Sequence, residues 1–83
     1  MNFGDALVLI KQRRKLQRKN WNGKDMWITL CETYTVHDVP FNVCWNEGGG
    51  TNPFIIMKTA DNKLIPWLAS QTDILAEDWI VID

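Results

Sequence analysis

Histidine and cysteine, the residues that most often carry acid–base and nucleophilic chemistry, are scarce in this sequence. Its 83 residues include one histidine, His37, and two cysteines, Cys31 and Cys44, with no C-x-x-C spacing. No second histidine and no basic cluster accompanies either cysteine to make a reactive thiolate. Asp73 and Glu77 are four residues apart, which is more typical of a solvated helix face than of an acid–base pair. We therefore expect a protein that is not an enzyme, with no metal site and no cofactor.

Long apolar runs and phosphate-binding glycine loops are also missing. No hydrophobic stretch approaches the roughly 20 residues that a membrane helix needs, and the N-terminus has no signal-peptide pattern. We therefore expect a cytoplasmic protein in which both cysteines are reduced thiols. The glycines at 48–50 lead into Thr51, Asn52 and Pro53 rather than into a helix, and no lysine follows at P-loop spacing. That segment is predicted to be a loop without a role in phosphate binding.

Tryptophan, in contrast, is abundant, with five residues in a chain of 83. A chain of this length forms one domain, here taken as residues 1–83, and buries only about 60% of its unfolded surface. Little of the chain is then left to enclose a ligand, so we expect a binding site to need a second protomer. Because aromatic residues dominate both cores and interfaces, the excess of tryptophan predicts that the rings serve in both.

Charge is divided unevenly along the chain. Residues 1–24 hold seven of the nine basic residues against Asp5 alone, whereas residues 25–83 hold two basic and nine acidic residues. The basic part either forms a patch that binds an anion or meets the acidic part within the fold or across a subunit contact, and we expect a mixture of the two. The acidic remainder disfavours nucleic acid as a general partner.

The first element is predicted to be a short helix. Asn2 can cap it, and Asp5 lies three residues later, where a carboxylate can bond back to the cap. Four apolar residues follow helical spacing, namely Phe3, Ala6, Leu7 and Ile10. The helix should end by about residue 13, because Lys11 and the arginines after it suit its negative C-terminal end.

A hairpin is predicted after the helix. Asn22-Gly23 is the strongest short signal for a hairpin turn, and it precedes an expected strand at 26–31. A two-residue turn would place Arg18 opposite Trp27, a cation–π contact worth about 0.5–1 kcal/mol at an exposed site. The next pair along would be a poor match, so the register of this hairpin stays open.

A second hairpin is predicted to turn at Asp61-Asn62, two residues that tolerate left-handed backbone. Counting outward gives three pairs on an apolar face, which are Thr59 with Leu64, Met57 with Pro66, and Ile55 with Leu68. On the other, half-polar face Lys58 and Trp67 become diagonal neighbours. Pro66 has no N–H and therefore predicts an edge strand or a bulge.

The last third of the chain completes an α+β fold. Ser70-Gln71-Thr72-Asp73 has the form of a capping box and predicts a short helical turn, followed by a final strand at 79–82. Residues 32–53 are predicted to be an inserted loop or a hairpin with strands at 33–36 and 41–45. We therefore expect a small antiparallel sheet of two or three hairpins, with an N-terminal helix and a short helical turn before the last strand.

The sequence resembles the Thoeris anti-defence 2 family of small bacteriophage proteins. The resemblance lies in the length and in three stretches, MNFGDAL, WNGKDMW and MKTADNKLIPWLASQTDILAEDW. It covers residues 1–30 and 54–82, and the last motif is long enough to be specific. The resemblance implies a homotetramer in the cytoplasm of the infected bacterial host, with ligand pockets at contacts between protomers. Such proteins bind glycocyclic ADP-ribose signals made by TIR-domain immune proteins and hold them without cleavage, and some also capture cyclic di- or trinucleotides of CBASS defence.

The residue types that such a ligand requires are present. A cyclic nucleotide needs a π-face for its base, cations for its phosphates and polar side chains for its ribose hydroxyls. The ligand-binding candidates are Trp21, Trp27 and Trp67 for stacking, Arg18, Lys24 and Lys58 for phosphate, and Asn22, Ser70, Gln71 and Asp73 for ribose or the base edge. Each tryptophan is equally a candidate for the core or a subunit contact, Trp79 above all, and Ser70 and Asp73 are candidates for capping alone.

Two departures from the family and two rival functions stay open. Residues 32–53 are longer and more aromatic than the family suggests, and Trp45 has no clear counterpart, which bears on which signal is bound. Asn62 stands where glycine is more usual in a hairpin turn. The basic run KQRRKLQRK at 11–19 is the basis for a nucleic-acid-binding alternative, and a direct protein inhibitor of a host enzyme is the other.

Overall fold

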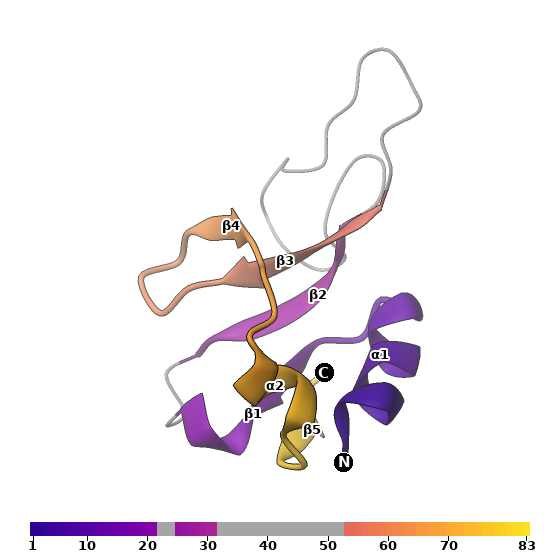
Figure 1. The fold of residues 1–83 in the computed structure, drawn as a ribbon. Coiled ribbons are helices and arrows are strands. Elements are labelled where there is room, and N and C mark those ends of the chain that lie inside the picture. Colours follow the sequence, from indigo (N-terminus) through magenta and orange to yellow (C-terminus); the bar gives the residue numbers. More distant parts are fainter. Residues whose placement is uncertain (22–24, 32–52) are drawn as a thin grey trace.

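The protein forms one antiparallel sheet with a helix packed on one face (Figure 1). The computed structural model describes residues 1–21, 25–31 and 53–83. In chain order the elements are α1 (Phe3–Lys11), β1 (Leu16–Arg18), a 3-10 turn η1 (Lys19–Trp21), β2 (Trp27–Cys31), β3 (Phe54–Lys58), β4 (Leu64–Pro66), α2 (Gln71–Leu75) and β5 (Trp79–Val81). The five strands follow the order β4-β3-β2-β1-β5. The α+β class, the N-terminal helix and the short helix before the last strand are confirmed.

Helix α1 begins and ends where its local signals predict. The Asn2 side chain accepts a hydrogen bond from the Asp5 backbone N–H at 2.8 Å, and the helix ends at Lys11 with Gln12 as its C-cap. Arg13 then takes a left-handed conformation, with φ at 66°, that turns the chain toward β1. Ala6 and Ile10, four residues apart on one face, are fully buried.

The core lies between α1 and one face of the sheet. Leu16 is opposite both Ile28 and Val81, and Ile28 is opposite Met57, so these side chains point to the same face. The buried core residues are Ala6, Ile10, Leu16, Ile28, Met57 and Trp79. Each large side chain that is fully buried there contributes about 1.5–3 kcal/mol of transfer free energy.

The first hairpin has a different register from the one that a two-residue turn would give. Leu16 is opposite Ile28, and the 3-10 turn at Lys19–Trp21 lengthens the connection, so β2 begins only at Trp27. Arg18 is therefore not opposite Trp27. The cation over the Trp27 ring is Lys15, whose Nζ lies 5.1 Å from the ring centroid. The predicted Asn22-Gly23 turn lies outside the described residues.

The second hairpin is shifted by one residue from the prediction. Lys58 is opposite Leu64 and Ile56 is opposite Pro66, because the connection is a three-residue loop rather than a two-residue turn. The Thr59 N–H donates to the Lys63 carbonyl at 2.8 Å, and Asn62 has φ at 65°, the geometry of a turn that ends in a left-handed residue. The shift moves Trp67 to the core side of the sheet, where it packs against the buried cluster. The predicted contact between Lys58 and Trp67 is therefore wrong.

The second face of the sheet carries a smaller apolar cluster. Cys31 and Ile56 are buried there, with Trp27 and Leu64 packed against them. Cys31 is disulfide-bonded, so the expectation of a reduced thiol is wrong at this position, and Cys44 lies outside the described residues. Among the helices of the described residues, none is long and apolar enough to cross a membrane.

Both edges of the sheet agree with the sequence signals. Pro66 lies in β4, the edge strand next to β3, where a missing N–H removes no central hydrogen bond. At the other edge, β5 pairs with β1 and places Trp79 opposite Arg18. Helix α2 begins with the predicted capping box, because the Ser70 hydroxyl accepts from the Asp73 N–H and the Asp73 carboxylate accepts from the Ser70 N–H. The predicted loop or hairpin at residues 32–53 lies outside the described residues, apart from Pro53.

Candidate functional site

The predicted ligand-binding residues do not form one site within the chain. Two groups lie on opposite faces of the sheet. The first, which we call the tryptophan cluster, consists of Phe3, Trp21, Trp67 and Trp79. The second, the Trp27 pocket, is lined by Lys15, Gln17, Asp25, Trp27, Lys58, Ile82 and Asp83. Two further candidates, Asn22 and Lys24, lie outside the described residues.

Trp79 is the centre of the tryptophan cluster. It is fully buried, and its ring centroid lies 5.4 Å from that of Trp21 and 6.0 Å from that of Trp67, both nearly perpendicular to it. Phe3 lies 5.5 Å from Trp79 and 6.1 Å from Trp67. Edge-to-face packing of this kind adds about 0.5–1.5 kcal/mol per pair beyond burial. Trp79 therefore belongs to the core, whereas Trp21 and Trp67 are held by it and stay partly exposed.

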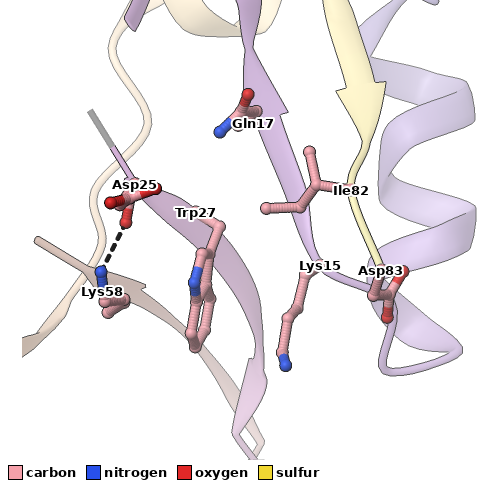
Figure 2. A pocket seen from close by; sticks show the side chains of 7 residues that line it. All are labelled: Lys15, Gln17, Asp25, Trp27, Lys58, Ile82 and Asp83. Atoms are coloured by element: carbon pink, nitrogen blue, oxygen red, sulfur yellow. Dashed lines mark hydrogen bonds between the residues drawn. The ribbon is translucent and has the colours of Figure 1, made fainter. Parts of the chain in front are cut away.

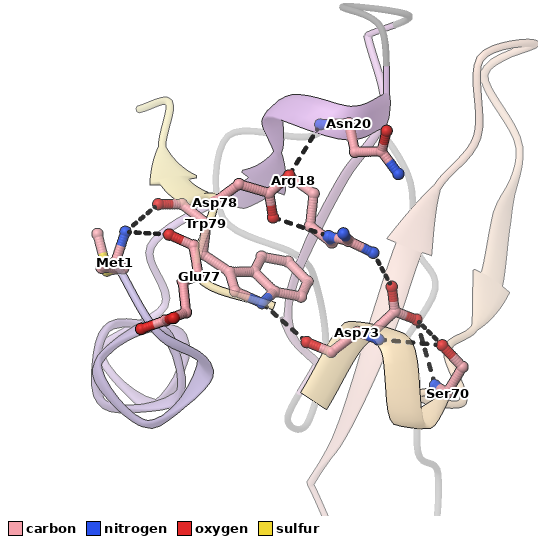
Figure 3. Close-up of polar contacts among 8 residues, drawn as sticks. All are labelled: Met1, Arg18, Asn20, Ser70, Asp73, Glu77, Asp78 and Trp79. Atoms are coloured by element: carbon pink, nitrogen blue, oxygen red, sulfur yellow. Dashed lines mark hydrogen bonds and ion pairs between the residues drawn. The ribbon is translucent and has the colours of Figure 1, made fainter. Parts of the chain in front are cut away.

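A polar network fixes the elements that carry these rings (Figure 3). Arg18 donates from Nε to Asp78 Oδ1 at 2.9 Å and from Nη1 to Asp73 Oδ1 at 3.0 Å. The other oxygen of Asp73 accepts from the Ser70 N–H and hydroxyl, and the Asp73 carbonyl accepts from Trp79 Nε1 at 3.0 Å. One arginine on β1 thereby connects the start of α2 to the start of β5.

The charges of this network stabilise one another. The hydrogen bond with Asp78 raises the pKa of Arg18 further above its usual value, against the effect of burial. In return, the hydrogen bond from Arg18 lowers the pKa of Asp78, and the Asn20 backbone N–H, which donates to Oδ2 at 3.1 Å, adds to the shift. Both groups are therefore charged at neutral pH.

The network gives three predicted site residues a structural role. Ser70 and Asp73 do cap α2, and Asp73 also pairs with Arg18, which the sequence pattern did not indicate. The Arg18 guanidinium, with two carboxylate partners, positions α2 and β5. Gln71, the first residue of α2, is exposed. Of the polar candidates at this end of the described chain, Gln71 is thus the one that is turned to solvent and takes no part in the network.

The Trp27 pocket lies on the other face of the sheet and has a volume of about 490 Å³. Figure 2 shows Trp27 between Lys58 on β3 and Lys15, which precedes β1. Lys58 is directly opposite Trp27, and its Nζ donates to the Asp25 carbonyl at 2.7 Å. Asp25 has φ at 56°, so the chain turns sharply just before β2 and brings that carbonyl to the lysine. Lys58 and Trp27, two of the predicted candidates, therefore lie together. Trp67, a third candidate, packs on the opposite face of the sheet.

The remaining residues of the pocket were missed from the sequence. Gln17 donates from Nε2 to the Met26 carbonyl at 2.9 Å. Asp83 accepts from Arg14 Nε at 2.9 Å. Burial raises its pKa, but the bond from Arg14 and the Lys15 backbone N–H outweigh burial and lower it overall. Lys15 and Gln17 would have been found if the hairpin register had been known, because it is the register that puts them beside Trp27.

Both groups combine partly exposed indole rings with polar or cationic side chains. The described residues contain no group of three or more histidine, cysteine, aspartate or glutamate side chains that could hold a metal ion. His37 and Trp45 lie outside the described residues. What the described part of the chain offers is aromatic surface beside polar and cationic groups.

Comparison with known proteins identifies the family. The family model described as "Tad2-like: Thoeris anti-defense 2-like domain" matches residues 1–82. The chain is also 41% identical over 85 residues to "Thoeris anti-defense 2" of Bacillus phage SP01, an alignment that covers 99% of this chain and 94% of that protein. The match also covers residues 31–53, between the two parts of the chain that carry the resemblance. The chain therefore belongs to the Thoeris anti-defense 2-like family, and this membership supports a role in phage anti-defence.

Proposed function

We propose that the protein binds a glycocyclic ADP-ribose immune signal and holds it without cleaving it, so that the effector of the defence system is not activated. The observation that carries the proposal is family membership over residues 1–82 together with the two partly exposed rings of the tryptophan cluster. Sequestration acts by mass action, so it requires high affinity and abundance and needs no catalytic group. It takes place in the cytoplasm of the infected host.

Stacking is the main attraction in this proposal. Trp21 and Trp67 present partly exposed indoles that are packed from behind by Trp79, so they are held in place before a ligand arrives. Each base–aromatic contact is worth about 1–3 kcal/mol. Rigid rings lose little entropy on binding, which increases affinity.

Polar side chains around the rings then select the ligand. Gln71 bonds the base edge or ribose, and Asn22 and Lys24, which follow Trp21 in sequence, are proposed to contact ribose and phosphate. Arg18, Ser70 and Asp73 act through one another, because their mutual bonds fix the position of α2 beside Trp67. Trp27 and Lys58 are on the other face of the same chain and therefore do not complete this pocket within one protomer.

The binding site is proposed to be completed by a second protomer in a homotetramer. Three apolar side chains that follow Trp67 are turned to solvent in the isolated chain: Leu68 is 92% exposed, Leu75 76% and Ile74 47%. Exposed apolar groups clustered near one element are typical of protein contact sites. A contact between protomers there would cover these side chains and enclose a ligand lying on Trp67.

The test is a titration of candidate cyclic ADP-ribose isomers, followed by heat denaturation and identification of the released ligand. We expect stoichiometric capture and recovery of the isomer intact. A cleaved product would contradict sequestration, and binding of cyclic di- or trinucleotides instead would assign the protein to CBASS signals. Tight binding of polynucleotide that falls steeply with salt would favour nucleic acid as the target.

Replacement of Trp67 by alanine should weaken capture at least tenfold, because it removes a stacking surface worth about 1–3 kcal/mol. Since this change also opens the core, Gln71→Ala is the companion variant, as Gln71 is exposed and supports no packing. Lys63→Ala, at the exposed β3–β4 turn, is the matched control. Calorimetry measures ligand affinity in all three variants, and sedimentation checks the oligomer. Wild-type affinity in both Trp67→Ala and Gln71→Ala would show that the tryptophan cluster is not part of the binding site.

A further inference from the structure

The Trp27 pocket is an independent site on the face of the sheet opposite to the tryptophan cluster. Trp27 packs with the small cluster of Cys31 and Ile56, whereas Trp21 and Trp67 pack with the main core. A ligand in one place therefore cannot contact the other within the same protomer. The volume of about 490 Å³ is in the range of pockets that hold small molecules.

Of the two ammonium groups in the pocket, that of Lys15 lies over an aromatic ring and that of Lys58 bonds a backbone carbonyl. Lys15 Nζ is 5.1 Å from the Trp27 ring centroid, and Lys58 Nζ donates to a backbone carbonyl, that of Asp25. Within the described part of the chain, no ion pair is recorded for either lysine. The two carboxylates at the rim do not offset this charge equally, because Asp83 is paired with Arg14 and only the exposed Asp25 side chain remains.

We propose that the Trp27 pocket binds a nucleoside monophosphate or a similarly small aromatic phosphate. The heterocycle stacks on the Trp27 indole in the place that the Lys15 ammonium occupies in the unliganded protein. Lys15, displaced from the ring, turns to the phosphate together with Lys58. The exchange is favourable because a cation–π contact at a partly exposed ring is worth about 0.5–1 kcal/mol, less than stacking of a base, and the lysine gains a charge-assisted bond.

This mechanism makes an unusual prediction for Lys15. Lys15→Gln removes a phosphate ligand and at the same time removes the group that competes for the ring. AMP should therefore bind several-fold more weakly to the variant, whereas adenosine, which has no phosphate, should bind more tightly than it does to the wild type. Lys58→Gln removes a phosphate contact and the ammonium bond to the Asp25 carbonyl but no group that competes for the ring, so it should weaken AMP binding and leave adenosine binding unchanged.

The experiment is a titration of the full chain with AMP and with adenosine, in which binding is measured by isothermal calorimetry or by NMR of the indole N–H groups. The proteins are wild type, Lys15→Gln, Lys58→Gln, Trp27→Leu and the control Lys63→Gln. We expect AMP binding in the wild type and the control, a loss of at least tenfold in Trp27→Leu, and the opposite shifts for the two ligands in Lys15→Gln. No AMP binding at millimolar concentration, or shifts in the same direction in Lys15→Gln, would overturn the proposal.

The Trp67→Ala variant separates this site from the proposed function. It should lose the cyclic ADP-ribose isomer and keep AMP, and Trp27→Leu should do the reverse. AMP binding that is lost in Trp67→Ala but kept in Trp27→Leu would place AMP in the tryptophan cluster and refute a site at Trp27. Because Trp27→Leu also alters packing around Ile56, the two lysine variants keep the test decisive if that protein is unstable.

Discussion

Arg18 illustrates how a single side chain connects distant parts of this chain. The residue is 9% exposed, and its guanidinium bonds Asp78 and Asp73, which follow it by 60 and 55 residues. A buried charge with one partner missing costs far more than an exposed one, because the remaining charge is left without compensation in a medium that solvates it poorly. The stability of the region around Trp79 therefore depends on this residue.

Replacing Arg18 by methionine should lower the free energy of unfolding by about 2–3 kcal/mol, since Asp73 and Asp78 keep their charges without a cation beside them. Methionine preserves the apolar part of the side chain, so the loss reports on the charge. Urea unfolding followed by tryptophan fluorescence measures it. The control is Lys63→Met, whose Nζ lies 3.8 Å from Asp61 on an exposed turn and should contribute almost nothing. An equal effect of the two changes would mean that the Arg18 network does not stabilise the fold.

Acid should weaken the same network. The pKa of Asp78 is lowered in the folded protein by its bond from Arg18, so the unfolded chain takes up this proton first. The contribution of Asp78 to the free energy of unfolding is then fully present above its ordinary pKa of 3.8. It is lost as the pH falls through the lower pKa of the folded state. Urea midpoints between pH 7 and pH 2.5 should show a decrease that is smaller in Asp78→Asn. A variant with the same slope as the wild type would contradict this assignment.

At the scale of the elements, end signals were predictable and strand registers were not. Asn2 and Ser70 act on N–H groups three residues away, so a short stretch of sequence determines where α1 and α2 begin. The register of a hairpin depends on the length of its connection, and one additional residue moves every side chain of a strand to the other face. This is why the helices and strands of the described residues were located to within a few residues while Trp67 was placed beside Lys58.

The same dependence applies to the candidate site. The residue types were found from composition and motif, because few other side chains can stack on a base or bind phosphate. Their grouping into a tryptophan cluster and a Trp27 pocket required the registers of β1 with β2 and of β3 with β4. Lys15 was missed because it belongs to a basic run in which no local feature distinguishes one lysine from another.

The β3–β4 turn offers a direct test at this scale. Asn62 has φ at 65°, where glycine has no steric penalty and a residue with a Cβ does. Asn62→Ala should therefore destabilise the protein by about 1 kcal/mol, whereas Asn62→Gly should be neutral or slightly stabilising. Thermal unfolding of the two variants measures the difference. If alanine were tolerated as well as glycine, the turn would not have this left-handed residue in solution.

At the scale of the whole molecule, the uneven charge is resolved in part by ion pairs among the described residues. Arg14 pairs with Asp83, and Arg18 with Asp73 and Asp78, so basic residues near the start meet acidic residues near the end. The expected self-complementation is confirmed for these pairs. The positive charge left at Lys15 and Lys58 is the part that our further proposal assigns to an anion.

Assembly can be tested through the exposed apolar residues beside Trp67. Leu75→Glu introduces a charge at a position that is 76% exposed in the isolated chain, so it should leave the fold of the protomer intact. If a second protomer covers this residue, the buried charge should split the homotetramer and weaken ligand capture together. Sedimentation velocity and calorimetry give the two readings. Val8→Glu, at a 56% exposed position on α1, is the control, and an unchanged mass for Leu75→Glu would exclude this surface as the contact.

The strand order β4-β3-β2-β1-β5 also determines when the sheet can be completed during synthesis of the chain. Strand β1 is translated early, but its partner β5 begins only at Trp79, and Arg18 has no carboxylate partner until Asp73 and Asp78 are made. Pairings this distant form slowly compared with local ones. A nascent chain that has not reached Trp79 therefore carries an unfinished sheet, in which β1 can pair only with β2.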